Sequence, residues 1–254
     1  MISVVTRVKH PELYDRLKDS VRKNSVTEIK LAAIHDLNGD PDIARTYNSL
    51  GSAHPADIIV FAEDDVMILD DAWDIKLMEE FEATGADILG VVGVDEYKGS
   101  PMFGVGYPHC FGKYVTGDGD EPDTVKIFSR RILNKRLDVI DGFFMAVRGE
   151  FFKKNKFDEQ FDGLWCYPED LCLRGKVYLS DILLAHHKPS KYYGKYPENL
   201  RPESDYSPAF YKKWGIEPMK KIGDMRCATT KLPNLISDGQ DRIYAEFESR
   251  YIHA

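Results

Sequence analysis

A short apolar run that ends in three consecutive acids is the feature of this chain with the clearest chemical meaning. Residues 58–62 are all apolar, and Glu63, Asp64 and Asp65 follow them directly. Such a run is typical of a strand that is buried on both faces, as in the middle of a parallel sheet. Three adjacent carboxylates repel one another unless a cation neutralises them. The sequence therefore predicts a cation site at the carboxyl end of a buried strand.

The spacing within this acidic triplet indicates which carboxylates share the cation. Side chains two residues apart in a strand point the same way, so Glu63 and Asp65 are predicted to hold one ion while Asp64 faces elsewhere. A few carboxylate oxygens suit Mg²⁺ or Mn²⁺, which leave positions open for substrate phosphates. Open α/β sheets bind ligands at the carboxyl ends of their strands, which favours a metal–diphosphate site. Capping of the next helix, which Asp70 and Asp71 precede, is the structural alternative.

Further acids fall where a strand breaks or a helix begins. Asp141 and Gly142 interrupt an apolar segment, where a glycine permits close approach of a ligand, although an ordinary turn also explains the pair. Glu169 and Asp170 follow Pro168 in the first turn of a predicted helix. The helix dipole favours carboxylates in that position, so either helix capping or general-base catalysis explains them.

Two adjacent histidines follow another apolar segment. Because neighbouring strand residues face opposite sides, one of His186 and His187 is predicted to point to the acidic triplet and the other into packing. A histidine in such a place is usually structural, but beside a carboxylate site it becomes a candidate third metal ligand.

The elements that must position these residues alternate between strands and helices. Predicted strands cover residues 2–5, 29–34, 58–62, 88–94, 125–128, 139–147 and 177–185, and predicted helices begin near residues 10, 40, 73, 150 and 168. This alternation predicts a three-layer α/β fold with a mostly parallel, Rossmann-like sheet. Residues 98–122, rich in Gly, Pro and Tyr, predict a long, partly irregular excursion near a site. Residues 1–190 are predicted to form one domain, with residues 191–254 as its irregular, wrapping C-terminal extension.

Composition narrows the class of protein. The net charge of −8 over 254 residues argues against a generic polyanion binder. Four scattered cysteines without a Cys-x-x-Cys pair fit a reduced, cytoplasmic protein and make a structural zinc site unlikely. The N-terminus runs straight into a strand, and no apolar run approaches the ~20 residues that a membrane span requires.

Taken in order, these features resemble the family 2-like glycosyltransferases of the GT-A fold. The resemblance covers residues 1–190 and is nearest to the bacterial streptomycin-cluster-like branch. The matching segments are residues 3–6 (Ser-Val-Val-Thr), 44–48 (Ala-Arg-Thr-Tyr-Asn), the acidic triplet as an Asp-x-Asp-type motif, and residues 141–148, 157–161 and 169–174. Each motif alone is weak, but their common order is specific.

The resemblance implies a metal-dependent, inverting glycosyltransferase that moves a sugar from a nucleoside-diphosphate sugar, with a UDP-sugar favoured, to an acceptor hydroxyl. Glu63 and Asp65 would hold Mn²⁺ or Mg²⁺ on the diphosphate, with His187 or His186 as a later ligand. The residues that would contact the nucleotide follow strand ends and are Thr6, Arg7, Asp36 and Asp64.

On the acceptor side, the resemblance implies that Asp170 deprotonates the acceptor hydroxyl, while Asp141 and Glu169 line the pocket for acceptor and sugar. The reaction would be a single in-line displacement with inversion at the anomeric carbon. The metal would stabilise the departing diphosphate while the base activates the nucleophile.

Three other functions remain open. A glycosyltransferase acting on a modified nucleic-acid base, rather than on a glycan, would suit the mixed Lys and Tyr residues of 188–196. A nucleotidylyltransferase also places acids around Mg²⁺, but it normally has a Gly-rich loop after the first strand, and residues 6–10 contain no glycine. A non-catalytic GT-A-like binding protein is harder to reconcile with the intact acids, because unpaired charges are costly to keep.

Overall fold

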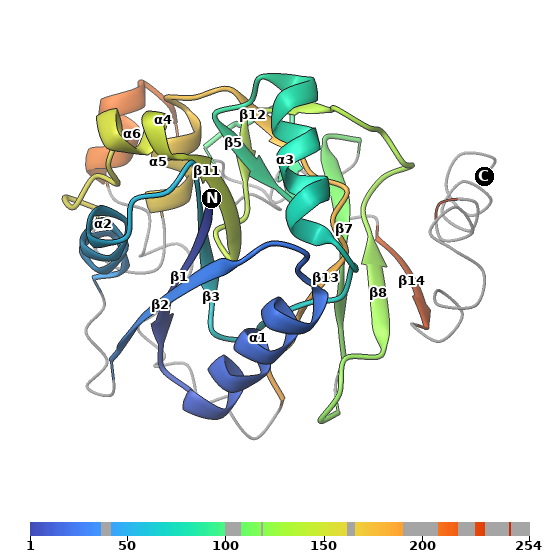
Figure 1. The fold of residues 1–254 in the computed structure, drawn as a ribbon. Coiled ribbons are helices and arrows are strands. Elements are labelled where there is room, and N and C mark those ends of the chain that lie inside the picture. The colour runs from blue at the N-terminus through green and yellow to red at the C-terminus, as the bar shows by residue number, and fades with distance from the viewer. Residues whose placement is uncertain are drawn as a thin grey trace.

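The computed structural model describes residues 1–36, 42–99, 108–117, 119–161, 166–189, 208–217, 227–231 and 244 of the chain (Figure 1). The elements are β1 (Ile2–Val8), α1 (Pro11–Asn24), β2 (Ile29–His35), α2 (Ile43–Ala53), β3 (Ile58–Glu63), β4 (Val66–Ile68), α3 (Trp73–Thr84), β5 (Ile88–Gly90), β6 (Val92–Val94), β7 (Cys110–Thr116), β8 (Thr124–Ile127), β9 (Arg136–Leu137), β10 (Val139–Ile140), β11 (Phe144–Arg148), α4 (Gly149–Lys154), α5 (Tyr167–Cys172), β12 (Val177–Leu179), β13 (Leu184–His186), α6 (Pro208–Trp214) and β14 (Ala228–Lys231).

The main sheet has the strand order β2-β1-β3-β11-β5-β12-β9. β2, β1 and β3 are parallel, as are β5 and β12, whereas β11 runs antiparallel between β3 and β5. Because β1 lies between β2 and β3, right-handed crossovers place α1 and α2 on opposite faces of the sheet. The predicted α/β fold with a mostly parallel, Rossmann-like sheet is therefore confirmed.

A second sheet, in the order β10-β6-β7-β13-β4, lies beside the first, and β8 and β14 extend it from β7 (Figure 1). Three segments predicted as single strands are each divided between the two sheets, namely 88–94, 139–147 and 177–185. Gly90 lies at one such division, and a Cβ there would lie 2.3 Å from Ile140 Cδ1. Residues 88–94 are apolar or glycine throughout, so their pattern does not reveal the division, whereas polar residues lie at the other two divisions, Asp141 and Ser180–Asp181.

α1 begins and α3 ends where the sequence indicates, whereas α2 is capped by Asp42 rather than by residue 40. α1 begins at Pro11 as predicted, and α3 ends before Gly85, which has the left-handed φ of 62°. The cap of α2 is Asp42, whose side chain accepts a hydrogen bond from Arg45 N at 2.9 Å. Residues 40 and 41, where that helix was predicted to open, lie outside the described residues.

The later part of the chain departs from prediction in one further place. The excursion predicted over residues 98–122 contains the regular strand β7, although residues 100–107 and 118 are outside the described part. Of the predicted C-terminal extension, the structure describes α6, residues 227–231 including β14, and Tyr244, and β14 pairs with β8. Within the described residues, no helix combines the length and apolarity that crossing a membrane requires.

Candidate active site

The acidic triplet lies between β3 and β4, and its backbone is held from two directions. Glu63 N donates to Phe143 O at 3.0 Å, in the turn that joins β10 to β11. His187 N donates to Asp65 O at 3.0 Å, at the end of β13. Both sheets therefore converge on the triplet, which is why residues distant in sequence meet there.

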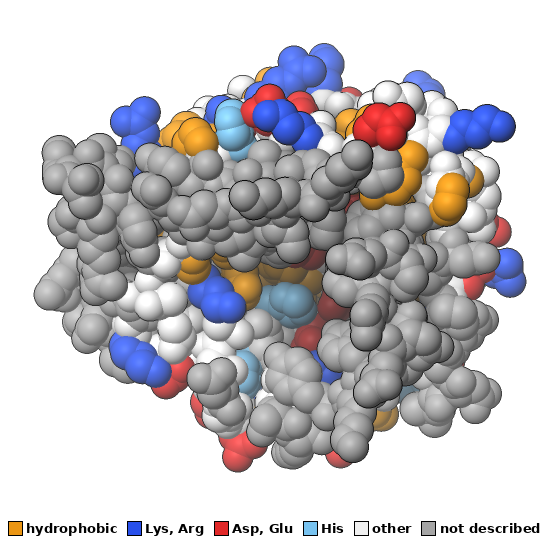
Figure 2. All heavy atoms as spheres, turned by 180° about the vertical axis from the view of Figure 1, so that it is seen from behind, with side chains coloured by type: hydrophobic (Ala, Val, Ile, Leu, Met, Phe, Trp, Pro, Cys, Tyr) orange, Lys and Arg blue, Asp and Glu red, His pale blue; other side chains and the backbone are white. Residues whose placement is uncertain are grey.

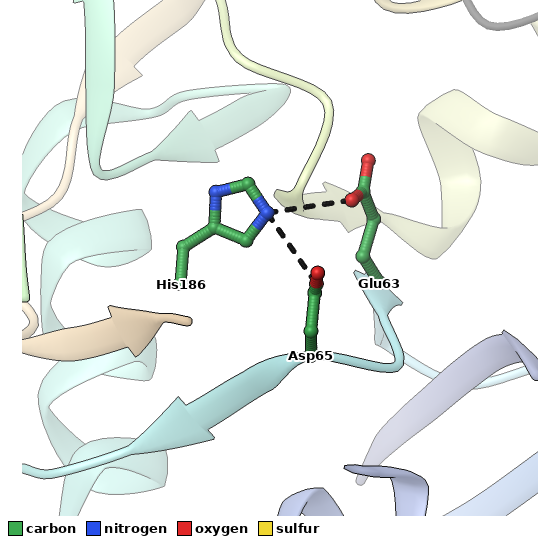
Figure 3. Close-up of side chains that lie close together, drawn as sticks. All are labelled: Glu63, Asp65 and His186. Atoms are coloured by element: carbon green, nitrogen blue, oxygen red, sulfur yellow. Dashed lines mark ion pairs between the residues drawn. The ribbon is translucent and has the colours of Figure 1, made fainter. Parts of the chain in front are cut away.

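Glu63, Asp65 and His186 point toward one another (Figure 3). His186 Nε2 lies 3.4 Å from Glu63 Oε2 and 3.3 Å from Asp65 Oδ1. One ligand atom from each residue lies within 4.8 Å of the others. Phe143 stacks on the His186 ring, with centroids 4.3 Å apart, and so fixes its orientation. We call these three side chains the metal triad. Glu63 ends β3 and Asp65 lies in the turn to β4, so this turn brings the two carboxylates together.

The charges within the metal triad favour a cation between the two acids. Burial opposes ionisation of Asp65, but the hydrogen bond and charge of His186 lower its pKa overall. Burial likewise opposes protonation of His186, yet its contacts with Asp65 and Glu63 raise its pKa well above the usual value. The two carboxylates therefore favour a positive charge between them.

His187 lies outside the metal triad, so of the two adjacent histidines His186 is the one beside the acids. Its side chain is 1% exposed, and neither ring nitrogen has a hydrogen-bond partner among the described residues. The reason is the alternation anticipated from sequence, since His186 and His187 are adjacent in an extended segment and face opposite sides.

The residues expected to contact the nucleotide fall into two environments. Arg7 donates through Nε to Asp36 Oδ2 at 3.0 Å and pairs with it through Nη2, which joins the ends of β1 and β2. Thr6 is fully buried inside the main sheet, and its contact with a nucleotide stays a prediction. Asp64 Oδ2 accepts hydrogen bonds from the backbone amides of Lys9 at 2.7 Å and His10 at 2.6 Å. Asp64 thus secures the turn into α1, and its contact with a nucleotide stays a prediction.

Gly142 brings α5 against the end of β10. A Cβ at this position would lie 2.6 Å from Tyr167 Oη and 2.8 Å from Pro168 Cγ. The close approach inferred from this glycine is therefore made by the protein's own helix rather than by a ligand. Beside it, Asp141 Oδ1 accepts a hydrogen bond from Phe143 N at 3.2 Å, and burial raises the Asp141 pKa to about 6.

The two acids of α5 differ sharply in their surroundings. Glu169 is 5% exposed, its Oε2 has no hydrogen-bond partner among the described residues, and burial raises its pKa to about 7. Asp170 is fully buried but fully partnered, with Arg174 Nη2 at 2.7 Å from Oδ2. Its Oδ1 receives Lys213 Nζ at 2.6 Å and Trp214 Nε1 at 3.0 Å.

Several residues around the site were not singled out from sequence. Lys213 and Trp214 come from α6, in a region whose weak periodicity gave no sign that it approaches α5. Lys9 lies at the end of β1, and burial followed by the charges of Arg7 and Lys188 lowers its pKa. Figure 2 shows histidine and acidic side chains at the floor of a hollow, with Lys or Arg side chains near its edge.

Comparison with known proteins identifies the family. The model of a family described as "Glycosyltransferase like family" matches residues 3–191. The chain belongs to this family. The predicted enzyme class, a glycosyltransferase, is thereby confirmed, while the streptomycin-cluster-like branch stays a prediction. No curated protein is significantly similar in sequence.

Solved structures show the same GT-A fold. GalNAc-T7 with UDP, GalNAc and Mn²⁺ has a TM-score of 0.53 and 11% identity, over 84% of this chain and 47% of that one. TarS 1–349 of S. aureus with UDP-GlcNAc has a TM-score of 0.48 and 13% identity, over 83% of this chain and 63% of that one. A197 from STIV has a TM-score of 0.41 and 13% identity, over 71% of this chain and 81% of that one. The chain thus spans less than two thirds of the TarS fragment.

Proposed function

We propose that this protein transfers a sugar, with inversion and with the help of a divalent cation, from a UDP-sugar to an acceptor hydroxyl. The observation that carries the proposal is the metal triad at the carboxyl end of β3, in a chain of a glycosyltransferase-like family. GalNAc-T7, which shares the fold, is described with UDP, GalNAc and Mn²⁺, and this supports the same class of donor and metal here.

The chemistry of the metal triad fits Mn²⁺ or Mg²⁺. Two carboxylates and one imidazole offer hard oxygen ligands and one nitrogen, a set that leaves coordination positions open for phosphate oxygens. Asp65 Oδ1 is buried, and among the described residues it lies 3.3 Å from His186 Nε2, a ligand atom of the same triad. When bound, the cation would offset the negative charge of the departing diphosphate.

Two lysines near the metal triad would add to the binding of phosphates. Lys9 follows β1 and Lys188 follows β13, and the charge of Lys188 contributes to lowering the pKa of Lys9. The charge of Lys188 also assists His186 in lowering the pKa of Asp65, against the effect of burial. Two ammonium groups that converge beside a cation site suit a diphosphate, whose charge neither would neutralise alone.

On the acceptor side, the acids are Asp141, Glu169 and Asp170. A carboxylate among them would take the proton of the acceptor hydroxyl, which makes the oxygen nucleophilic as the sugar leaves the diphosphate. A single displacement of this kind inverts the configuration at the anomeric carbon.

We also propose a cytoplasmic location, because no disulfide joins the four cysteines, all of which the structure describes.

Binding of UDP with and without Mn²⁺ tests this function. A ligand that binds only the folded state at 100 times its Kd adds about 2.7 kcal/mol of stability. We expect UDP to raise the Tm in Mn²⁺ much more than in EDTA, and Asp65→Ala to abolish that difference. Asp71→Ala, which removes an exposed acid outside the metal triad, is the matched control. Equal UDP shifts in Mn²⁺ and EDTA would contradict the proposal.

A further inference from the structure

The inference concerns which acid of α5 accepts the proton, and it rests on the proposed function. Asp170 is the expected base, yet both of its carboxylate oxygens already have partners. Arg174 occupies Oδ2, whereas Lys213 and Trp214 share Oδ1. Taking up a proton would neutralise the charge that Arg174 and Lys213 are paired with, and Lys213 belongs to α6.

Glu169 has the opposite surroundings. No cation is paired with it among the described residues, and Oε2 is buried without a hydrogen bond. A carboxylate in this state gains a partner, rather than losing one, when a hydroxyl approaches. Burial, with a contribution from the charge of Asp141, raises its pKa to about 7, near the value at which a general base works best in neutral solution.

Glu169 also lies within electrostatic reach of Asp141, which neighbours the metal triad. Consecutive helical residues diverge by about 100°, so Glu169 and Asp170 address different regions. Asp170 faces Arg174 and α6, as its contacts show. Glu169 lies close enough to Asp141 to feel its charge, and Asp141 in turn feels the charges of His186 and Glu63. Asp141 therefore connects Glu169 to the metal triad, where the leaving group would bind.

We propose that Glu169 is the general base and that Asp170 is a positioning residue that holds α5 and α6 together. In the transfer step, the acceptor oxygen forms its bond to the anomeric carbon while its proton passes to the Glu169 carboxylate. The bond between the anomeric carbon and the diphosphate oxygen breaks, and its electron pair leaves with the diphosphate. Arg174, Lys213 and Trp214 take no part in the proton transfer.

The kinetics of Glu169→Gln and Asp170→Asn separate the two assignments. The assay uses the UDP-sugar that raises the Tm most and measures release of UDP with water as the acceptor. Water can replace the natural acceptor because the base must remove a proton from the attacking oxygen in both cases. We expect Glu169→Gln to lose about 10²–10⁴-fold in kcat while binding UDP and Mn²⁺ as the wild type does. The fall in rate at low pH, which reports protonation of the base, should disappear in Glu169→Gln. Asp170→Asn should keep that fall in rate, and its kcat should stay within about tenfold of the wild-type value.

A further pair of variants covers the case in which Asp170→Asn does not fold. Lys213→Met and Trp214→Phe remove the partners of Asp170 Oδ1. If Asp170 is the base, these variants should raise kcat. If Glu169 is the base, kcat should be unchanged or lower. Near-wild-type turnover by Glu169→Gln, or a gain in the α6 variants, overturns the inference. If the wild type does not bind UDP with Mn²⁺, the proposed function is wrong. The inference about Glu169 is tested separately, by the turnover of Glu169→Gln when UDP and Mn²⁺ still bind.

Discussion

Burial of Glu169 makes a quantitative prediction about the stability of the fold. Its pKa is about 7 in the folded protein, against an ordinary value of 4.5. Between these two values the folded state binds more protons than the unfolded state, so stability decreases as pH rises from about 4.5 to 7 and is constant outside that range. The difference of about 2.5 units corresponds to roughly 3 kcal/mol, at about 1.4 kcal/mol per unit.

Glu169→Gln removes this titration while keeping the shape of the side chain. The stability of the variant relative to wild type should therefore improve by roughly 3 kcal/mol between pH 4.5 and pH 8. Any cost of burying the amide is independent of pH and cancels in this difference. Asp141, whose pKa burial raises to about 6, is present in both proteins and largely cancels as well.

Urea unfolding in EDTA at intervals from pH 4.5 to 8 measures the effect. Glu150→Gln, at an exposed position in α4, serves as the matched control and should follow the wild type throughout. Parallel stability curves for wild type and Glu169→Gln would refute the reasoning, because they would mean that Glu169 ionises in the folded state as easily as in the unfolded chain.

Two further predictions concern the framework of the site. Gly142→Ala should destabilise the protein by about 1–3 kcal/mol, because its Cβ would meet Tyr167 Oη at 2.6 Å, whereas Gly119→Ala, with nothing within 4 Å, should change the Tm little. Asp181→Asn should cost roughly 3–5 kcal/mol in urea unfolding, because it leaves the 2%-exposed Lys113 without its 2.5 Å ion pair. If Gly142→Ala leaves the stability unchanged, α5 can shift to accept the added Cβ. If Asp181→Asn leaves it unchanged, Lys113 does not depend on that ion pair.

The sequence alone determined the features that depend on local periodicity. Apolar runs and helical spacing predicted the main strands and helices, because burial of one face demands that pattern. Alternation along a strand predicted that Glu63 and Asp65 face together, and that only one of two adjacent histidines joins them. The order of the motifs predicted the family and fold that the comparisons confirmed.

Only the tertiary structure decided how the strands are shared and which acid is neutralised. Residues 88–94, 139–147 and 177–185 each serve two sheets. The first of them has no polar side chain, and such a segment is buried equally well in either sheet. Glu169 and Asp170 are equivalent in a sequence, as adjacent acids in one helical turn. They differ because Trp214, 44 residues after Asp170, and the neighbouring Lys213 bind Asp170 rather than Glu169. Long-range contacts of that kind leave no local pattern in the sequence, so only the tertiary structure distinguishes the surroundings of the two carboxylates.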